Sequence, residues 1–172
     1  GYPVLCRSSG SSQRGIGVAR SAAELPQVYR RAAEVAERVG SQVILERHLT
    51  HVRRLEVPVI STPAGERWAL AVIDASLRRR DGSVMVEAPA PGLSDATTEK
   101  LRTLAVDLAA AFEHEHVGTM VFLFDPRAGH GTFPGYDFCC GGEDAAAEAL
   151  RGMDLAQGPL RITLGGERLS PP

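Results

Sequence analysis

The chain has 172 residues, 44% of them hydrophobic and 23% charged, with a formal net charge of -2 at neutral pH. This length suits one ordinary domain or two small subdomains around a hydrophobic core. Acidic and basic residues are mixed along the chain, so nucleic acid is not expected as a partner. No apolar run approaches the roughly 18 to 20 residues of a membrane span, so a membrane is not expected as a partner either. A cytoplasmic location is expected.

The first 50 residues predict two strands, a helix and a third strand. Apolar runs at residues 2–7 and 16–19 flank a loop of small residues, which predicts strand, loop, strand. Ser21 and Glu24 have the spacing of a capping box, and apolar residues then recur at helical spacing until Gly40, so a helix is predicted over about 22–39. Residues 43–46 predict the next strand.

The rest of the chain predicts further strands at residues 55–60, 68–73 and 84–86, with a polar connection over 74–83. Pro58 lacks an N–H group, so an edge position or an interruption is predicted there. Ser94 begins a helix that extends to about His114, residues 117–124 form a buried strand, and 145–151 form a short helix. Strands and helices that do not alternate regularly indicate an α+β fold.

Cysteine and histidine residues give little reason to expect a metal site or a catalytic thiol. Cys6, Cys139 and Cys140 fit neither a disulfide framework nor a zinc site, so reduced thiols are expected, and no histidine can be named as a partner for a catalytic thiol. His114 and His116 are two residues apart, a spacing that separates side chains on a helix, so a helix-end charge effect is favoured over a metal site.

Several segments resemble the biotin carboxylase family in the same order along the chain. The string E-A-P-A-P-G-L-S at residues 87–94 is similar to a family signature. The supporting segments are residues 1–4 before the lid loop, 43–49 at the adenine hinge, 53–57 (R-H-x-E-x), 74–80 (D-C-S-x-Q-R-R), 118–124 (G-T-x-E-F-L-x) and 152–155 (G-x-D-L). Essentially the whole chain therefore resembles biotin carboxylases, which are ATP-grasp enzymes.

The resemblance implies an α+β ATP-grasp fragment with a small lid subdomain at residues 1–50. The central subdomain at 51–172 is expected to have a mainly antiparallel sheet flanked by helices. The family's N-terminal and C-terminal domains have no counterpart in this sequence. The implied cofactors are ATP and magnesium, and biotin is implied only as a carrier-linked substrate.

The resemblance also implies a nucleotide site that departs from the family pattern. Its expected residues are Arg7, Gly10, Gly15, Glu46, Arg47 and Leu49. Arg7 replaces a lysine, which keeps the charge but not the shape of the side chain. The loop at residues 10–15 is one residue shorter than the family's glycine loop and carries serine and glutamine, whose Cβ atoms restrict positive φ and disfavour a phosphate cradle.

The phosphate and metal positions depart further. The family's two metal glutamates align with Val121 and Asp137, so Asp137 is the remaining metal candidate, although magnesium prefers several oxygen ligands. The remaining catalytic candidates are Arg80 and Glu143. Other aligned changes are Asp81 for a histidine, Ser83 for a lysine and Cys139 for an asparagine, and residues 78–80 are a candidate anion site.

Three functions follow from this pattern. The first is a degenerate, catalytically impaired domain that acts as a binding or assembly module, with other carboxylase subunits, a biotin carrier protein or further copies of itself as expected partners. The second is an active ATP-dependent biotin carboxylase, a ligase, in which the missing groups come from other chains or from Arg7, Arg79, Arg80, Asp137 and Glu143. The third is a nucleotide sensor without turnover, because the hinge keeps more of the family pattern than the phosphate end.

Overall fold

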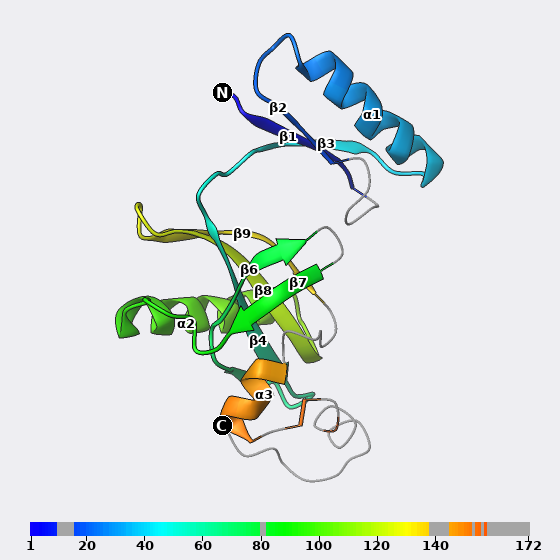
Figure 1. Cartoon of the computed structure of the whole chain (residues 1–172). Coiled ribbons are helices and arrows are strands. Elements are labelled where there is room, and N and C mark those ends of the chain that lie inside the picture. The colour runs from blue at the N-terminus through cyan, green and yellow to red at the C-terminus, as the bar shows by residue number, and fades with distance from the viewer. Residues whose placement is uncertain (10–15, 80–81, 138–144, 153, 156, 158–172) are drawn as a thin grey trace. The chain divides into compact units, whose positions relative to one another are not determined.

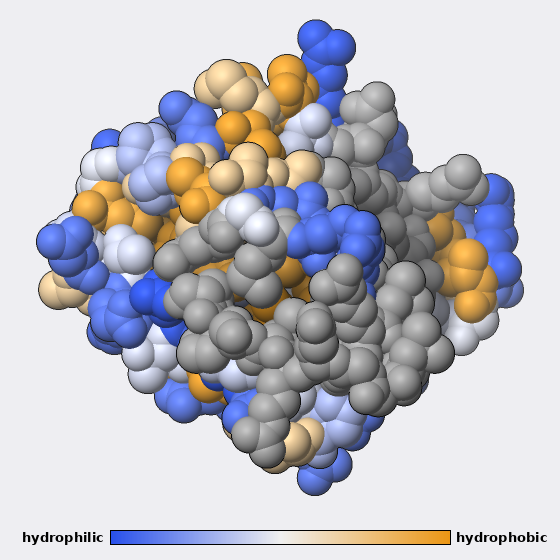
Figure 2. Space-filling view, turned by 90° about the horizontal axis from the view of Figure 1, so that it is seen from below, coloured by the Kyte–Doolittle hydropathy of each residue, from blue (hydrophilic) through white to orange (hydrophobic). Residues whose placement is uncertain are grey.

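The computed structural model describes residues 1–9, 16–79, 82–137, 145–152, 154–155 and 157 (Figure 1). The chain divides into two compact units, residues 1–50 and residues 51–172. Each unit has its own antiparallel sheet and at least one helix, which confirms the predicted α+β class. Among these described residues, no helix is both long and apolar enough to cross a membrane. Figure 2 shows a face on which hydrophilic side chains separate small hydrophobic groups.

The first unit is a three-stranded sheet with one helix. Its strands are β1 (Val4–Ser8), β2 (Gly17–Ala19) and β3 (Val43–Arg47), in the order β2-β1-β3, and its helix is α1 (Leu25–Arg38). The buried residues are Cys6, Ser8, Ala19, Ala32 and Ala36. A Cβ atom at Gly17 would lie 2.6 Å from Val28 Cγ1, so glycine lets α1 approach β2 closely. Cys6 is a free thiol, as expected, and burial raises its pKa.

Helix α1 begins three residues later than the sequence predicts. The expected capping box is wrong, because the Glu24 carboxylate accepts a hydrogen bond from the Arg20 backbone N–H at 2.9 Å. The Ser21 carbonyl accepts from the backbone N–H groups of Glu24 and Leu25, which makes residues 21–24 a turn before the helix. Pro26 then lies in the first helical turn, where its missing N–H has no cost.

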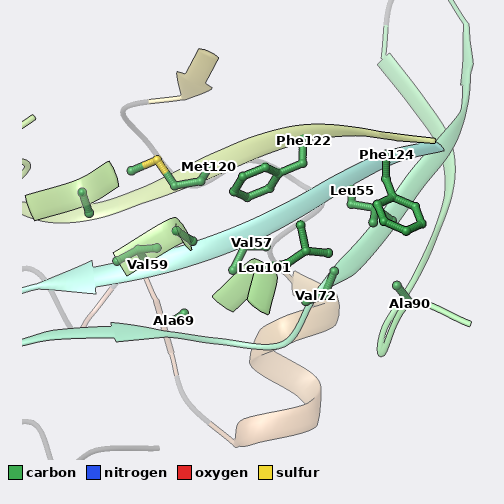
Figure 3. Packing of buried hydrophobic residues seen from close by; sticks show 12 residues of the cluster. Leu55, Val57, Val59, Ala69, Val72, Ala90, Leu101, Met120, Phe122 and Phe124 are labelled. Carbon is green, nitrogen blue, oxygen red and sulfur yellow. The ribbon is translucent and has the colours of Figure 1, made fainter. Parts of the chain in front are cut away.

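The second unit is a larger antiparallel sheet. Its strands are β4 (Arg53–Ser61), β5 (Arg67–Ala69), β6 (Ile73–Arg79), β7 (Gly82–Glu87), β8 (His116–Asp125) and β9 (His130–Asp137). The order is β7-β6-β4-β8-β9, and β5 also pairs with β4. Helix α2 (Asp95–Ala111) packs on one face through Leu101, which lies beside Val57 (Figure 3). Ala147 of α3 (Ala145–Arg151) joins a second core cluster that contains Ile60 and Ile73.

Pro58 lies in the middle of the central strand and not at an edge, so that alternative is wrong. Strand β4 pairs with β8 along its whole length, and Pro58 lies opposite Thr119. On its other side, β4 pairs with β6 up to Glu56 and with β5 from Val59 onward. The missing N–H falls between these two pairings, and the Pro58 carbonyl accepts from the Leu70 N–H at 2.9 Å. The predicted interruption is therefore confirmed on one side of the strand.

Two strand predictions need correction. The predicted strand over 68–73 is wrong, because β5 ends at Ala69 and β6 begins at Ile73. The polar stretch that follows is strand β6 and not a connection, and it forms a hairpin with β7. Strand β9 was not predicted, because Gly131, Pro134 and Gly135 break the expected strand pattern.

Helix α2 starts as predicted and ends three residues early. Ser94 Oγ accepts from the Thr97 N–H at 3.2 Å, which confirms the cap. The helix ends at Ala111 because Glu113 adopts a φ of 51° and the His114 N–H bonds the Ala109 carbonyl at 2.8 Å, the hydrogen bond of a Schellman motif. His114 thus lies beyond the helix, and His116 begins β8.

His114 is buried against β8 and does not act as a helix-end cation. Its Nε2 atom has no hydrogen-bond partner among the described residues. Burial lowers the pKa of His114, and the nearby His116 and Arg67 lower it further, so its neutral form is favoured. A Cβ atom at Gly118 would lie 2.4 Å from His114 Nε2. Only glycine at position 118 accommodates the imidazole without movement.

We expect Gly118→Ala to destabilise the chain by about 1 to 3 kcal/mol, because the added methyl group forces His114 or the strand to move. Urea unfolding followed by circular dichroism measures this change. Gly131→Ala is the matched control, because the nearest atom to its Cβ position is 3.7 Å away. Equal stability losses in the two variants would contradict the packing described for His114.

Candidate functional site

The face of the central sheet opposite α2 carries a buried carboxylate. Along β4, alternate side chains enter the core beneath α2, while Arg54 and Glu56 point to the other face. The Glu56 side chain is only 5% exposed. Arg54 Nε donates to Glu56 Oε1 at 2.6 Å, which supplies the positive charge that a buried carboxylate requires.

The β6–β7 hairpin brings a second arginine to Glu56. Arg78 Nη1 lies 3.6 Å from Glu56 Oε1 and donates to Ser83 Oγ at 2.7 Å. The pairing of β6 with β7 shifts register on both sides of Leu77, and such bulges change the direction of the following side chains. We infer that these irregularities turn Arg78 toward Glu56.

Asp137 at the end of β9 completes this group. Its Oδ2 atom lies 3.7 Å from Arg54 Nη2, and its side chain is 66% exposed. Val121 lies directly opposite both Glu56 and Gly135, so a buried apolar side chain separates the two carboxylate-bearing strands. We call the set Arg54, Glu56, Arg78, Ser83 and Asp137 the Glu56 cluster.

The Glu56 cluster does not fit the two magnesium ions that the family resemblance implies. Val121 has no ligand atom, and the carboxylates of Glu56 and Asp137 both contact Arg54. Within the described part of the chain, no three histidine, cysteine or acidic residues are grouped as metal ligands. Magnesium needs near-octahedral oxygen ligation, so these residues offer too few oxygen atoms that are free of a cation.

In the first unit, the structure pairs two predicted nucleotide-binding residues with each other. Arg7 Nε and Nη2 donate to Glu46 Oε2 and Oε1, both at 2.8 Å. Arg7 lies opposite Ile44 and Glu46 opposite Leu5, so they are diagonal neighbours on adjacent strands. The hydrogen bonds from Arg7 lower the pKa of Glu46, and the same contact raises the pKa of Arg7. The two predicted nucleotide-site residues Arg7 and Glu46 therefore already bind each other.

Of the other predicted site residues, Arg47 and Leu49 are described, and they join neither group. Arg47 is exposed at the end of β3, and Leu49 is half-buried after it. Gly10 and Gly15 lie outside the described residues, as do the catalytic candidates Arg80 and Glu143. The aligned positions Asp81, Cys139 and Cys140 also lie outside them, so their predicted roles stay predictions.

Sequence reasoning missed one partly buried ion pair on the α2 side of the sheet. Arg53 Nε donates to Asp74 Oδ2 at 2.8 Å, and Arg53 Nη2 donates to the Pro91 carbonyl at the same distance. Burial acts to raise the pKa of Asp74, but hydrogen bonds from Ser76 and Arg53 outweigh it and lower the pKa overall. This pair ties the turn at residues 87–94 to β4 and β6. Arg53 and Asp74 both lie in sequence segments that resemble the family. This resemblance is the sequence signal that could have identified the pair.

The family described as "Carbamoyl-phosphate synthase L chain, ATP binding domain" matches residues 1–170. The chain belongs to this family. Biotin carboxylase from Pseudomonas aeruginosa is 31% identical over 173 residues, which cover 99% of this chain and 38% of that protein. Urea amidolyase from Lachancea kluyveri is 30% identical over 169 residues, which cover 94% of this chain and 9% of that protein.

A solved structure of a biotin carboxylase from Campylobacter jejuni in complex with ATP is also similar to this family member. It has a TM-score of 0.89 and 26% sequence identity, and the match covers 99% of this chain and 39% of that chain. These matches confirm the resemblance to biotin carboxylases and the ATP-grasp fold. The chain spans about two-fifths or less of the length of each of these relatives.

In this family member, we expect Asp74→Asn to cost about 3 kcal/mol at pH 7, because it leaves Arg53 partly buried beside a neutral amide. The pKa of Asp74 is lower in the folded chain than in the unfolded chain, so its contribution is fully present above the unfolded pKa of about 3.9 and is lost as pH falls below it. Urea unfolding between pH 7 and pH 3 measures both effects. Asp107→Asn, at an exposed position, is the control, and an equal acid dependence in wild type and Asp74→Asn would contradict the assignment.

Proposed function

We propose that the chain is a degenerate biotin carboxylase-like ATP-grasp domain, impaired in catalysis, that acts as a binding or assembly module. The observation that carries this proposal is the internal pairing of the Glu56 cluster. Arg54 and Arg78 contribute two positive charges, and Glu56 and Asp137 contribute two negative charges, so the formal charges cancel. Phosphoryl transfer instead needs an excess of positive charge around the transferred group.

The first unit supports the same proposal. A nucleotide that used Arg7 for phosphate and Glu46 for adenine would have to separate a bidentate arginine–carboxylate pair. This separation costs interaction energy before any ligand contact forms. Glu46 of the adenine hinge therefore keeps the family's residue type, but its carboxylate is already paired with Arg7 of β1.

The second candidate is an active ATP-dependent biotin carboxylase, which forms carboxybiotin from bicarbonate and ATP. The similarity to biotin carboxylases over nearly the whole chain favours it. This function would need magnesium ligands and phosphate-binding cations from other residues or other chains. A nucleotide sensor without turnover is the intermediate case and would need only the hinge.

As an assembly module, the domain would act in the cytoplasm with other carboxylase subunits, a biotin carrier protein or further copies of itself. The exposed apolar side chains of Leu77, Val84 and Met85 lie on the β6–β7 hairpin, where they are available for such contacts. Biotin would enter only as a carrier-linked substrate of an associated active subunit.

Thermal unfolding with magnesium-ATP, ADP and adenosine tests the proposal. A ligand at 100 times its Kd would stabilise the chain by about 2.7 kcal/mol, which raises the Tm by roughly 5 to 10 °C. We expect no such rise at millimolar ligand, and no bicarbonate-dependent ATP hydrolysis in the presence of a biotin carrier.

The outcomes separate the candidate functions. Hydrolysis that depends on bicarbonate would overturn the proposal in favour of the ligase. A rise in Tm without hydrolysis would favour the sensor. Glu46→Gln would reduce such a rise if the hinge binds adenine, whereas the exposed Glu37→Gln on α1 would leave it unchanged.

A further inference from the structure

We infer that Arg54 is a built-in cation that occupies the place of a divalent metal ion between Glu56 and Asp137. This inference rests on the proposed function, because it explains why the family's metal chemistry would be absent. Arg54 Nε lies 2.6 Å from Glu56 Oε1, and Arg54 Nη2 lies 3.7 Å from Asp137 Oδ2. A single guanidinium group therefore joins the two carboxylates of the Glu56 cluster.

The strand register explains how one side chain reaches both acids. Glu56 of β4, Val121 of β8 and Gly135 of β9 lie in one row across the sheet. Asp137 is opposite Thr119 in the next row, and Arg54 is opposite Leu123 on the other side of Glu56. The long Arg54 side chain thus reaches back past Glu56, across a row whose members on β8 and β9 are valine and glycine.

The chemistry of the replaced positions agrees with this geometry. Position 121 carries valine where the family resemblance implies a metal glutamate, and position 54 carries arginine where it implies histidine. The first change removes a negative charge from the face, and the second adds a permanent positive charge, since arginine does not lose its proton in proteins. Both changes lower the affinity of the face for a divalent cation.

Without the charge of Arg54, Asp137 and Glu56 would be the two carboxylates of a weak cation site, although Glu56 is not one of the family's aligned metal positions. Magnesium is commonly held by one or two carboxylates together with water molecules. Glu56 lies in the central strand β4, and Asp137 ends β9, which is separated from β4 by β8. Arg78 also lies 3.6 Å from Glu56 Oε1, but Arg54 contacts both carboxylates, so its charge opposes a cation between them most directly.

The test is Mn²⁺ binding by the purified chain, followed by the loss of the free Mn²⁺ signal in electron paramagnetic resonance. Arg54→Gln removes a positive charge about 4 Å from the proposed ion, so we expect its affinity to exceed that of the wild type by about thirtyfold. Arg54→Lys keeps the charge and should bind as weakly as the wild type. Arg79→Gln removes an exposed charge from β6 and controls for a general charge effect.

The double variant Arg54→Gln with Asp137→Asn should lose the gained affinity, because it removes one of the two carboxylates. Unchanged Mn²⁺ affinity in folded Arg54→Gln, or an equal gain in Arg79→Gln, would overturn the inference. Circular dichroism shows whether each variant is folded. These results are independent of ATP hydrolysis by the wild type, so failure of this inference and failure of the proposed function give different observations.

A measurement on the wild type needs no variant. Millimolar Mn²⁺ broadens the NMR signals of nuclei near a bound ion, and here it should leave the amide signals of Val121 and Asp137 unchanged. Selective broadening of these two signals would show a metal site in the presence of Arg54 and would overturn the inference even if Arg54→Gln fails to fold.

Discussion

The central sheet depends on neutralising one buried carboxylate. Glu56 lies in the middle of β4, the strand that pairs with β8 along its length and with both β6 and β5 on its other side. A buried charge without a partner would cost several kcal/mol, so its position requires nearby cations. Arg54 and Arg78 meet this requirement. Because these cations come from within the chain, the described residues of the cluster carry no net formal charge that would attract a phosphate group or a metal ion.

Both units use arginine in the same way. Arg7 pairs with Glu46 in the first unit, and Arg53 pairs with Asp74 on the α2 side of the sheet in the second. Lys100 is the only lysine among the nineteen basic residues of the chain. Arginine keeps its charge when partly buried and binds carboxylates through two parallel hydrogen bonds, whereas lysine presents a single mobile charge. This preference suits stable internal pairs more than contacts that must form and break during catalysis.

The sequence predicted the elements with strong local signals. Helix α2 follows from Ser94 and a regular apolar stripe, and β8 follows from a continuous apolar run, so both were found. Strand β6 was mistaken for a connection because its polar residues pair with charges from distant strands. The Arg7–Glu46 and Arg54–Asp137 pairs join residues far apart in the sequence, so they depend on strand register, which no local pattern contains. The family resemblance named Arg7, Glu46 and Asp137 as site candidates, but it could not show that their charges are paired internally.

The central claim is that the charged side chains of the Glu56 cluster pair with one another and do not bind a metal–nucleotide complex. Crystals of the chain soaked in Mn²⁺ and ATP, with diffraction recorded at the manganese absorption edge, test this claim most directly. The account predicts no anomalous peak between Glu56 and Asp137, with the Arg54 guanidinium group in contact with both carboxylates. A manganese peak at that position, with Arg54 displaced and ATP phosphates beside the metal, would contradict the account.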